Sequence, residues 1–157
     1  MSVHSRAEQS LRTAALYGDM SALEFAIDAG ANPNSRDRFG NSALEFAASR
    51  GRVAVIRRLL KAGARPDSAG ASGSTALHTA AKWGRSHGVS ELLRRGADPT
   101  LADRHGRTAL DITRVAALER SKGGKAPYRG EVPEVEGHDM TIQGEPARKR
   151  GFGRFAT

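Results

Sequence analysis

The sequence predicts an all-α fold that stacks pairs of short helices, one pair for every 33 residues of chain. The first supporting observation is that glycine, alanine and proline recur with this spacing in one common register. The second is that apolar residues with helical spacing fill the intervals. Periods of roughly 20–50 residues are typical of repeat proteins, in which each unit buries its apolar face against its neighbours. The five series are Gly18, Gly51 and Gly84; Gly30, Gly63 and Gly96; Gly40, Gly73 and Gly106; Ala31, Ala64 and Ala97; and Pro33, Pro66 and Pro99.

The first helix of each unit is predicted from three segments in the same register. They read GNSALEFAASRG from Gly40, GSTALHTAAKWG from Gly73 and GRTALDITRVAA from Gly106. Each places a hydroxyl residue directly before an apolar run, where its oxygen can accept a hydrogen bond from a free backbone N–H at the start of a helix. These cap residues are Ser42, Thr75 and Thr108.

The second helix follows the next glycine of each unit. After Gly51, the stretch RVAVIRRLLKAGA places Val53, Ile56, Leu59 and Leu60 on one helical face and stops at Gly63. GANP, GARP and GADP then turn the chain toward the next unit. In the third unit Gly88 stands inside this helix. Because an interior glycine costs about 1 kcal/mol relative to alanine, we expect that helix to be short or to begin late.

These motifs resemble the ankyrin repeat, whose signature is T-P-L-H-x-A. The resemblance covers Ala7 to about Arg120, although alanine replaces the signature proline at positions 43, 76 and 109. It implies a solenoid of antiparallel helix pairs with β-turn fingers, and it implies that His78 serves hydrogen bonding within the stack. We therefore expect an N-terminal capping repeat (1–39), two full repeats (40–72 and 73–105), a C-terminal capping half-repeat (106–120) and an extended basic arm (121–157).

Composition narrows the classes of function. Cysteine is absent, which excludes disulfides and thiolate zinc sites. The apolar runs are far shorter than the roughly 18 residues of a membrane span. The five histidines are scattered, and no nucleophile, base and orienting group stand together in the sequence. We therefore expect no enzymatic activity, no cofactor, no metal and no small-molecule substrate. The start of the chain lacks the pattern of a secretory signal, so we expect a cytoplasmic protein or, alternatively, one in an organelle or a large intracellular assembly.

The resemblance implies that partners bind the finger tips and the outward positions of the first helices, on the concave side of the stack. The finger positions with large or charged side chains are Arg38, Phe39, Arg104, His105 and Arg107. The helix positions are Leu16, Tyr17, Ser49, Arg50, Lys82 and Trp83. Tryptophan, tyrosine and arginine are enriched at the energetic centres of interfaces, and the formal charge of +8 favours an acidic partner.

Two alternatives remain open for these residues. Tyr17 and Trp83 each precede a glycine of the repeat and could cover the gap between adjacent helices. The arginines could belong to a solvated face on which nearby carboxylates pair locally. Those carboxylates are Asp37, Glu45, Asp103 and Asp111.

The last part of the chain interleaves basic and aromatic residues, a pattern that can grip phosphates or dock on proteins. The residues are Arg148, Lys149, Arg150, Phe152, Arg154 and Phe155. The leading hypothesis is an adaptor or accessory structural subunit that holds an acidic protein segment on its concave face and with this arm. The alternative is an RNA-associated subunit of a ribonucleoprotein, in which the same basic residues contact phosphates.

Overall fold

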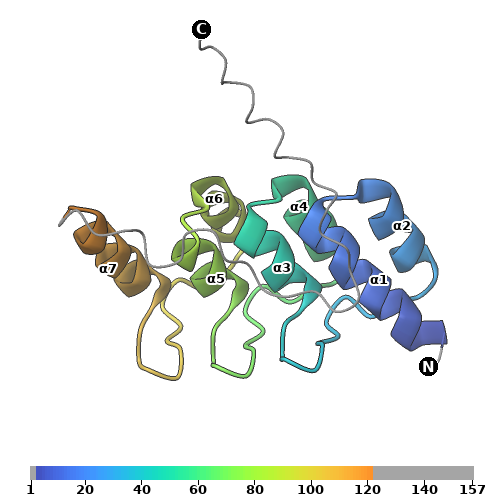
Figure 1. Ribbon diagram of the computed structural model, residues 1–157, viewed down its shortest axis with the longest axis horizontal. Helices are drawn as coiled ribbons and strands as arrows, with labels where there is room; N and C mark the ends of the chain where they lie inside the picture. The colour runs from blue at the N-terminus through green and yellow to red at the C-terminus, as the bar shows by residue number, and fades with distance from the viewer. Residues whose placement is uncertain (1–2, 122–157) are drawn as a thin grey trace, which may run out of the picture.

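The computed structural model describes residues 3–121, and within them the fold is an all-α solenoid, as predicted (Figure 1). Within residues 3–121, β-type backbone pairing is limited to one isolated antiparallel bridge between Arg36 and Ser42. The helices are α1 (Val3–Tyr17), α2 (Met20–Asp28), α3 (Ala43–Arg50), α4 (Val53–Lys61), α5 (Ala76–Lys82), α6 (Ser86–Arg94) and α7 (Ala109–Ser121).

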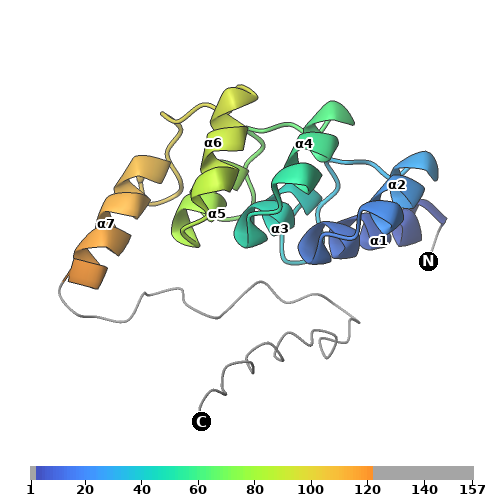
Figure 2. The same cartoon turned by 90° about the horizontal axis from the view of Figure 1, so that it is seen from above.

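The helices form two rows, which Figure 2 shows from above. The first helices of the units, α1, α3, α5 and α7, pack side by side in one row. The second helices, α2, α4 and α6, make the other row, and each packs on the first helix before it. The three loops that lead to α3, α5 and α7 extend to the same side of the stack (Figure 1). We call these loops the fingers and number them 1 (residues 35–42), 2 (68–75) and 3 (101–108).

The predicted caps are confirmed. Ser42 Oγ accepts a hydrogen bond from the Glu45 N–H at the start of α3. Thr75 makes a reciprocal pair with His78 at the start of α5. The α3 helix ends at Gly51, whose φ of 66° lies in the left-handed region that favours glycine.

The core between the rows is built largely from alanine and leucine. Alanines at equivalent positions of α1, α3 and α5 are buried, and their small size lets neighbouring first helices approach closely. They are Ala14, Ala47 and Ala80, and Ala15, Ala48 and Ala81. Leucines at another equivalent position, Leu11, Leu44 and Leu77, are also buried.

The expectation that Gly88 shortens the second helix of the third unit was wrong. The α6 helix has 9 residues, as many as α4, and begins at the equivalent position. Gly88 is buried, and a Cβ built on it would lie 3.6 Å from the Ile56 side chain and 3.7 Å from the Gly51 Cα. These are ordinary van der Waals distances, so the site has room for a larger residue, and the packing of α6 on α4 and α5 sustains the helix although glycine has poor helix propensity.

The α7 helix continues past the point where the other first helices stop. Ala117 stands where the earlier units have Gly18, Gly51 and Gly84, each of which has a positive φ. No second helix follows α7 within residues 3–121. No further first helix follows in that range either, whereas α5 is covered by both α6 and α7. Leu110, the next residue in the series after Leu77, is 59% exposed.

Candidate functional site

The three fingers touch one another and form a continuous edge. The Arg104 N–H donates to the Ser72 carbonyl at 3.0 Å, and the Arg104 guanidinium donates to the carbonyl of Ala71. Between fingers 1 and 2, a Cβ built on Gly40 would lie only 3.1 Å from that of Ala71. We call this surface the finger edge. The contacts hold its three tips at fixed positions relative to one another.

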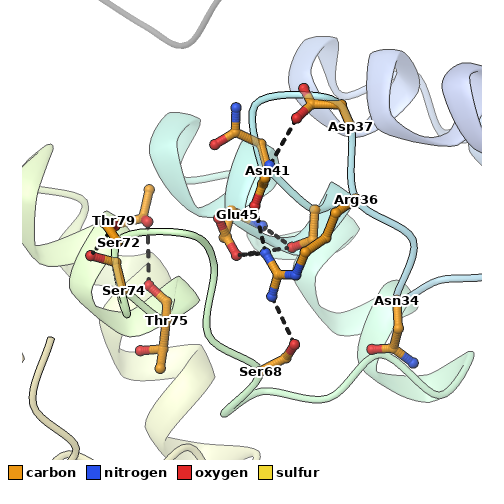
Figure 3. A network of polar contacts seen from close by, with 12 residues as sticks. Asn34, Arg36, Asp37, Asn41, Glu45, Ser68, Ser72, Ser74, Thr75 and Thr79 are labelled. Carbon is orange, nitrogen blue, oxygen red and sulfur yellow. Dashed lines mark hydrogen bonds and ion pairs between the residues drawn. The ribbon is translucent and has the colours of Figure 1, made fainter. Parts of the chain in front are cut away.

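Finger 1 is organised by an inward-turned carboxylate. Asp37 Oδ1 accepts hydrogen bonds from the N–H groups of Phe39 at 3.0 Å and Asn41 at 2.8 Å, and the latter is drawn in Figure 3. The equivalent residue of finger 2 is Gly70, which has no side chain to make these bonds. The acidic group of finger 1 is thus used to hold its own turn.

Finger 3 repeats this arrangement with Asp103. Its Oδ1 accepts from the N–H groups of His105 at 2.8 Å and Arg107 at 3.0 Å, while its Oδ2 pairs with the Arg107 guanidinium at 2.9 Å. Burial acts to raise the pKa of Asp103, but the hydrogen bonds from Arg107 and His105 outweigh it and lower the pKa to about 2. The carboxylate is therefore charged, and its side chain is only 1% exposed.

Arg36 joins finger 1 to the rest of the stack (Figure 3). Its Nη1 donates to the Gly40 carbonyl at 2.7 Å and to Glu45 Oε1 at 2.6 Å, and its Nη2 donates to Ser68 Oγ of finger 2 at 2.7 Å. Burial raises the pKa of Glu45, and the pairing with Arg36 opposes this effect. The network connects α3 and two fingers through one half-buried guanidinium.

The tips of fingers 1 and 3 carry the large side chains. Phe39 is 55% exposed, and the Arg38 guanidinium lies 4.9 Å from the centroid of its ring. Arg104, His105 and Arg107 are exposed on finger 3. The structure therefore brings these five candidate residues together along one edge.

Finger 2 presents only small groups at its tip, because Ala71 and Ser72 stand where the neighbouring fingers have arginine and an aromatic or imidazole ring. Both are exposed. The cationic and ring side chains of fingers 1 and 3 thus lie on either side of a middle finger whose tip carries only small side chains.

The candidate residues on the first helices lie at the ends of those helices that are opposite the fingers. Tyr17, Arg50 and Trp83 occupy equivalent positions at or just after the C-terminal ends of α1, α3 and α5. Since α3 has 8 residues, a rise of 1.5 Å per residue puts about 12 Å between these positions and the fingers. They form a second group, separate from the finger edge.

Within this second group, the rings differ in their surroundings. Tyr17 is half-buried and packs against the core, which agrees with the alternative that it covers a gap between helices. Trp83 is half-buried, and the exposed Lys82 places its ammonium 5.7 Å from the centroid of the Trp83 ring.

Two of the expected outward positions were wrong, because Leu16 and Ser49 are fully buried. The residues of α3 from Ala43 to Ser49 are in fact all buried. The prediction took two consecutive residues from each helix, but a turn of 100° per residue brings only one of them outward. The middle of α3 therefore offers no exposed side chain to a partner.

His78 has the structural role that the resemblance implied. It is buried, its Nδ1 lies 2.9 Å from Thr75 Oγ1, and its Nε2 lies 2.9 Å from the Arg107 carbonyl oxygen. One imidazole thus ties the start of α5 to finger 3. His87 and His105 are exposed.

A charge cluster that was not predicted from the sequence lies on the row of second helices. The Glu91 carboxylate of α6 pairs with Arg57 of α4 and with Arg94 and Arg95. Hydrogen bonds from Arg57 and Arg95 lower the pKa of Glu91 to about 2. The signal available in the sequence was the helical spacing of Glu91, Arg94 and Arg95, since residues three and four apart share a helix face.

Other kinds of site receive no support from the described residues. None of the helices in residues 3–121 is long and apolar enough to cross a membrane. The same part of the chain holds no group of three or more histidine, aspartate or glutamate side chains placed to bind a metal. The six predicted contacts of the basic arm, from Arg148 to Phe155, lie outside the described residues.

Comparison with known proteins agrees with this architecture. A search of curated proteins gave no match. A family model described as ankyrin repeats, in three copies, matches residues 11–103, which is more than half of the chain. Ankyrin repeats are in general protein–protein interaction modules. The matched region runs from the second half of α1 into finger 3 and contains all of α2 to α6. This chain belongs to the ankyrin-repeat family.

Proposed function

We propose that this protein is an adaptor or accessory subunit that holds an acidic segment of a protein partner along the finger edge. The observation that carries the proposal is the direction of the charges on that edge. The carboxylates of Asp37 and Asp103 bond to their own fingers, Asp103 pairing also with the Arg107 guanidinium, whereas Arg38 and Arg104 carry exposed cations. Guanidinium groups bind carboxylates in a bidentate geometry, so an edge of this kind favours an acidic partner.

The proposed anchor is the pair of Arg38 and Phe39 on finger 1. An exposed phenylalanine beside a guanidinium offers apolar contact area together with a charged group, which is the combination found at energetic centres of interfaces. Arg104 and His105 would contact the same partner from finger 3, above the small residues of finger 2. Because the finger contacts fix these tips in advance, little conformational entropy is lost on binding.

The test uses the full chain as bait in an extract of its own organism, with partners quantified by mass spectrometry. The matched pair of variants is Phe39→Ala and Phe25→Ala. Phe25 is 76% exposed but lies on α2, in the other row of helices. We expect Phe39→Ala to weaken partner retention by about 10-fold, the effect of removing a central interface residue, and Phe25→Ala to leave it unchanged. Equal retention by the two variants would place the contact elsewhere.

The RNA-associated alternative gives a different result in the same experiment. RNase treatment would release the partners, and retention would fall steeply between 50 and 200 mM salt, roughly 10³-fold or more for six or more phosphate contacts. A protein partner on the finger edge survives RNase and depends less on salt. We further propose that the basic arm adds a second contact to the same partner.

A further inference from the structure

A hollow of about 380 Å³ lies on the row of second helices, where α4 and α6 meet. It is on a different row from the first helices that carry the candidate partner contacts (Figure 2). Its polar lining comes from Arg57 of α4 and from Ser86, His87, Ser90, Glu91 and Arg94 of α6. We call it the α4–α6 hollow.

Two guanidinium groups converge at this hollow. Arg57 Nη2 and Arg94 Nη1 lie 3.3 Å and 3.2 Å from the same oxygen, Oε1 of Glu91. The Glu91 side chain is 3% exposed, whereas those of Arg57 and Arg94 are 50% and 71% exposed. The carboxylate therefore holds the two cations close together while remaining hidden beneath them.

The number of arginines exceeds what Glu91 needs for neutralisation. Between α2 and α4, the single Arg58 binds Glu24 through two hydrogen bonds of 2.7 and 2.8 Å. Between α4 and α6, three arginines share one carboxylate at 3.0 to 3.3 Å. The cluster thus carries a net charge of +2, and the guanidinium groups have N–H donors beyond those bonded to Glu91.

The remaining lining groups suit a tetrahedral anion. Ser86 and Ser90 are four residues apart on α6, so their hydroxyls lie on one helix face, and both are exposed. Hydroxyl donors beside two guanidinium groups match a phosphate monoester, which carries a charge of about −2 and several strong acceptor oxygens. The two guanidinium groups converge on one place in an open hollow, which suits a single phosphate group, whereas RNA binding requires cations spread along many phosphates.

We propose that the α4–α6 hollow binds a phosphorylated serine or threonine side chain of a protein partner. Arg57 and Arg94 would contact the phosphate oxygens, Ser86 and Ser90 would donate hydroxyl hydrogen bonds, and Glu91 positions the two arginines. This site is separate from the finger edge, so its test does not depend on whether the function proposed above is correct.

The experiment measures the binding of a fluorescein-labelled phosphoserine peptide to the full chain by fluorescence anisotropy. The key variant is Arg94→Gln, and the matched control is Arg95→Gln. Both remove one positive charge at the C-terminal end of α6 and one contact to Glu91, but Arg95 does not line the hollow. Loss of a charge-assisted hydrogen bond should weaken binding about 10-fold in Arg94→Gln, against less than about 3-fold in Arg95→Gln from long-range charge alone.

A second variant keeps the test decisive if the arginine variants lose stability. Ser90→Asp puts a carboxylate into the hollow without touching a Glu91 pair, and it should abolish binding of the phosphopeptide. Circular dichroism melts report whether each variant is folded.

The proposal would be overturned if the phosphopeptide does not bind at millimolar concentration, or if Arg94→Gln and Arg95→Gln weaken its binding equally. It would also be overturned if a peptide with glutamate in place of phosphoserine binds with equal affinity. Equal affinity for inorganic phosphate would mean that the ligand is a free ion. Binding of poly-U RNA that depends on Arg94 would likewise replace a phosphopeptide by a nucleic acid.

Discussion

Equivalent leucines of successive repeats should differ sharply in what they contribute to stability. Leu77 and Leu110 occupy the same place in the third and fourth units, but Leu77 is 2% exposed and Leu110 is 59% exposed. The difference arises because both α6 and α7 pack on α5, whereas within the described residues neither a second helix nor a further first helix follows α7. Truncation to alanine at both positions therefore measures what these following helices contribute together.

The expected magnitudes follow from burial. Replacing a buried leucine by alanine costs about 2–5 kcal/mol, because apolar area returns to water on unfolding and a cavity remains in the fold. Leu77→Ala should fall in this range. Leu110 is more than half exposed, and its truncation leaves no closed cavity. At about 0.8 kcal/mol for each fully buried CH₂ group, Leu110→Ala should cost less than about 1 kcal/mol.

Urea denaturation followed by circular dichroism gives the free energy of unfolding of each variant. Leu44→Ala, at the same position of the second repeat and 3% exposed, is the control for a buried member of the series. It should behave like Leu77→Ala. A cost for Leu110→Ala as large as that for Leu77→Ala would refute the reasoning, since it would mean that Leu110 is covered in solution.

Three further predictions concern two glycines and the pH dependence of stability. A Cβ on Gly88 would meet its neighbours at 3.6 Å or more, so Gly88→Ala should stabilise the fold by about 1 kcal/mol through helix propensity, measured as a shift of the urea midpoint. Gly73→Ala should instead destabilise it, because φ is 74° and the Cβ would lie 2.9 Å from a backbone nitrogen of finger 3. The low pKa of Glu91 and Asp103, about 2 against 4.5 and 3.8, means that the unfolded chain binds protons more readily. Stability should thus fall as pH drops from about 4.5 toward 2, and Glu91→Gln should flatten this dependence in urea titrations. Glu45 acts in the opposite direction, because burial raises its pKa.

Much of the fold followed from spacing alone, because helix starts and stops depend on local chemistry. Ser42 and Thr75 cap their helices by bonds to residues three positions away, and Gly51 ends its helix by its own φ. Such features can be predicted from residues that are close together in the sequence. The full length of α6 could not be predicted in this way, since the packing that sustains this helix despite Gly88 is against α4 and α5, which are separate elements of the chain.

The candidate site was predictable in part for the same reason. Finger residues such as Phe39 and His105 stand at turn tips, where side chains have few neighbours to bury them. On the helices, the direction of a side chain depends on which turn faces the next unit. A choice of two consecutive positions therefore included the buried Leu16 and Ser49 beside Tyr17 and Arg50.

Two acidic side chains are buried beneath the arginines that they pair with. The chain has 25 lysines and arginines against 17 aspartates and glutamates. On the finger edge, Asp103 is buried by the turn that it organises. On the second helices, Glu91 is buried by the arginines that it holds together. In both places the carboxylate acts as an internal support and the guanidinium groups face outward. Replacing Asp103 by asparagine or Glu91 by glutamine should therefore have two effects. It removes a negative charge, and it releases the arginine side chains from the positions in which the carboxylate holds them. The second effect should be the larger.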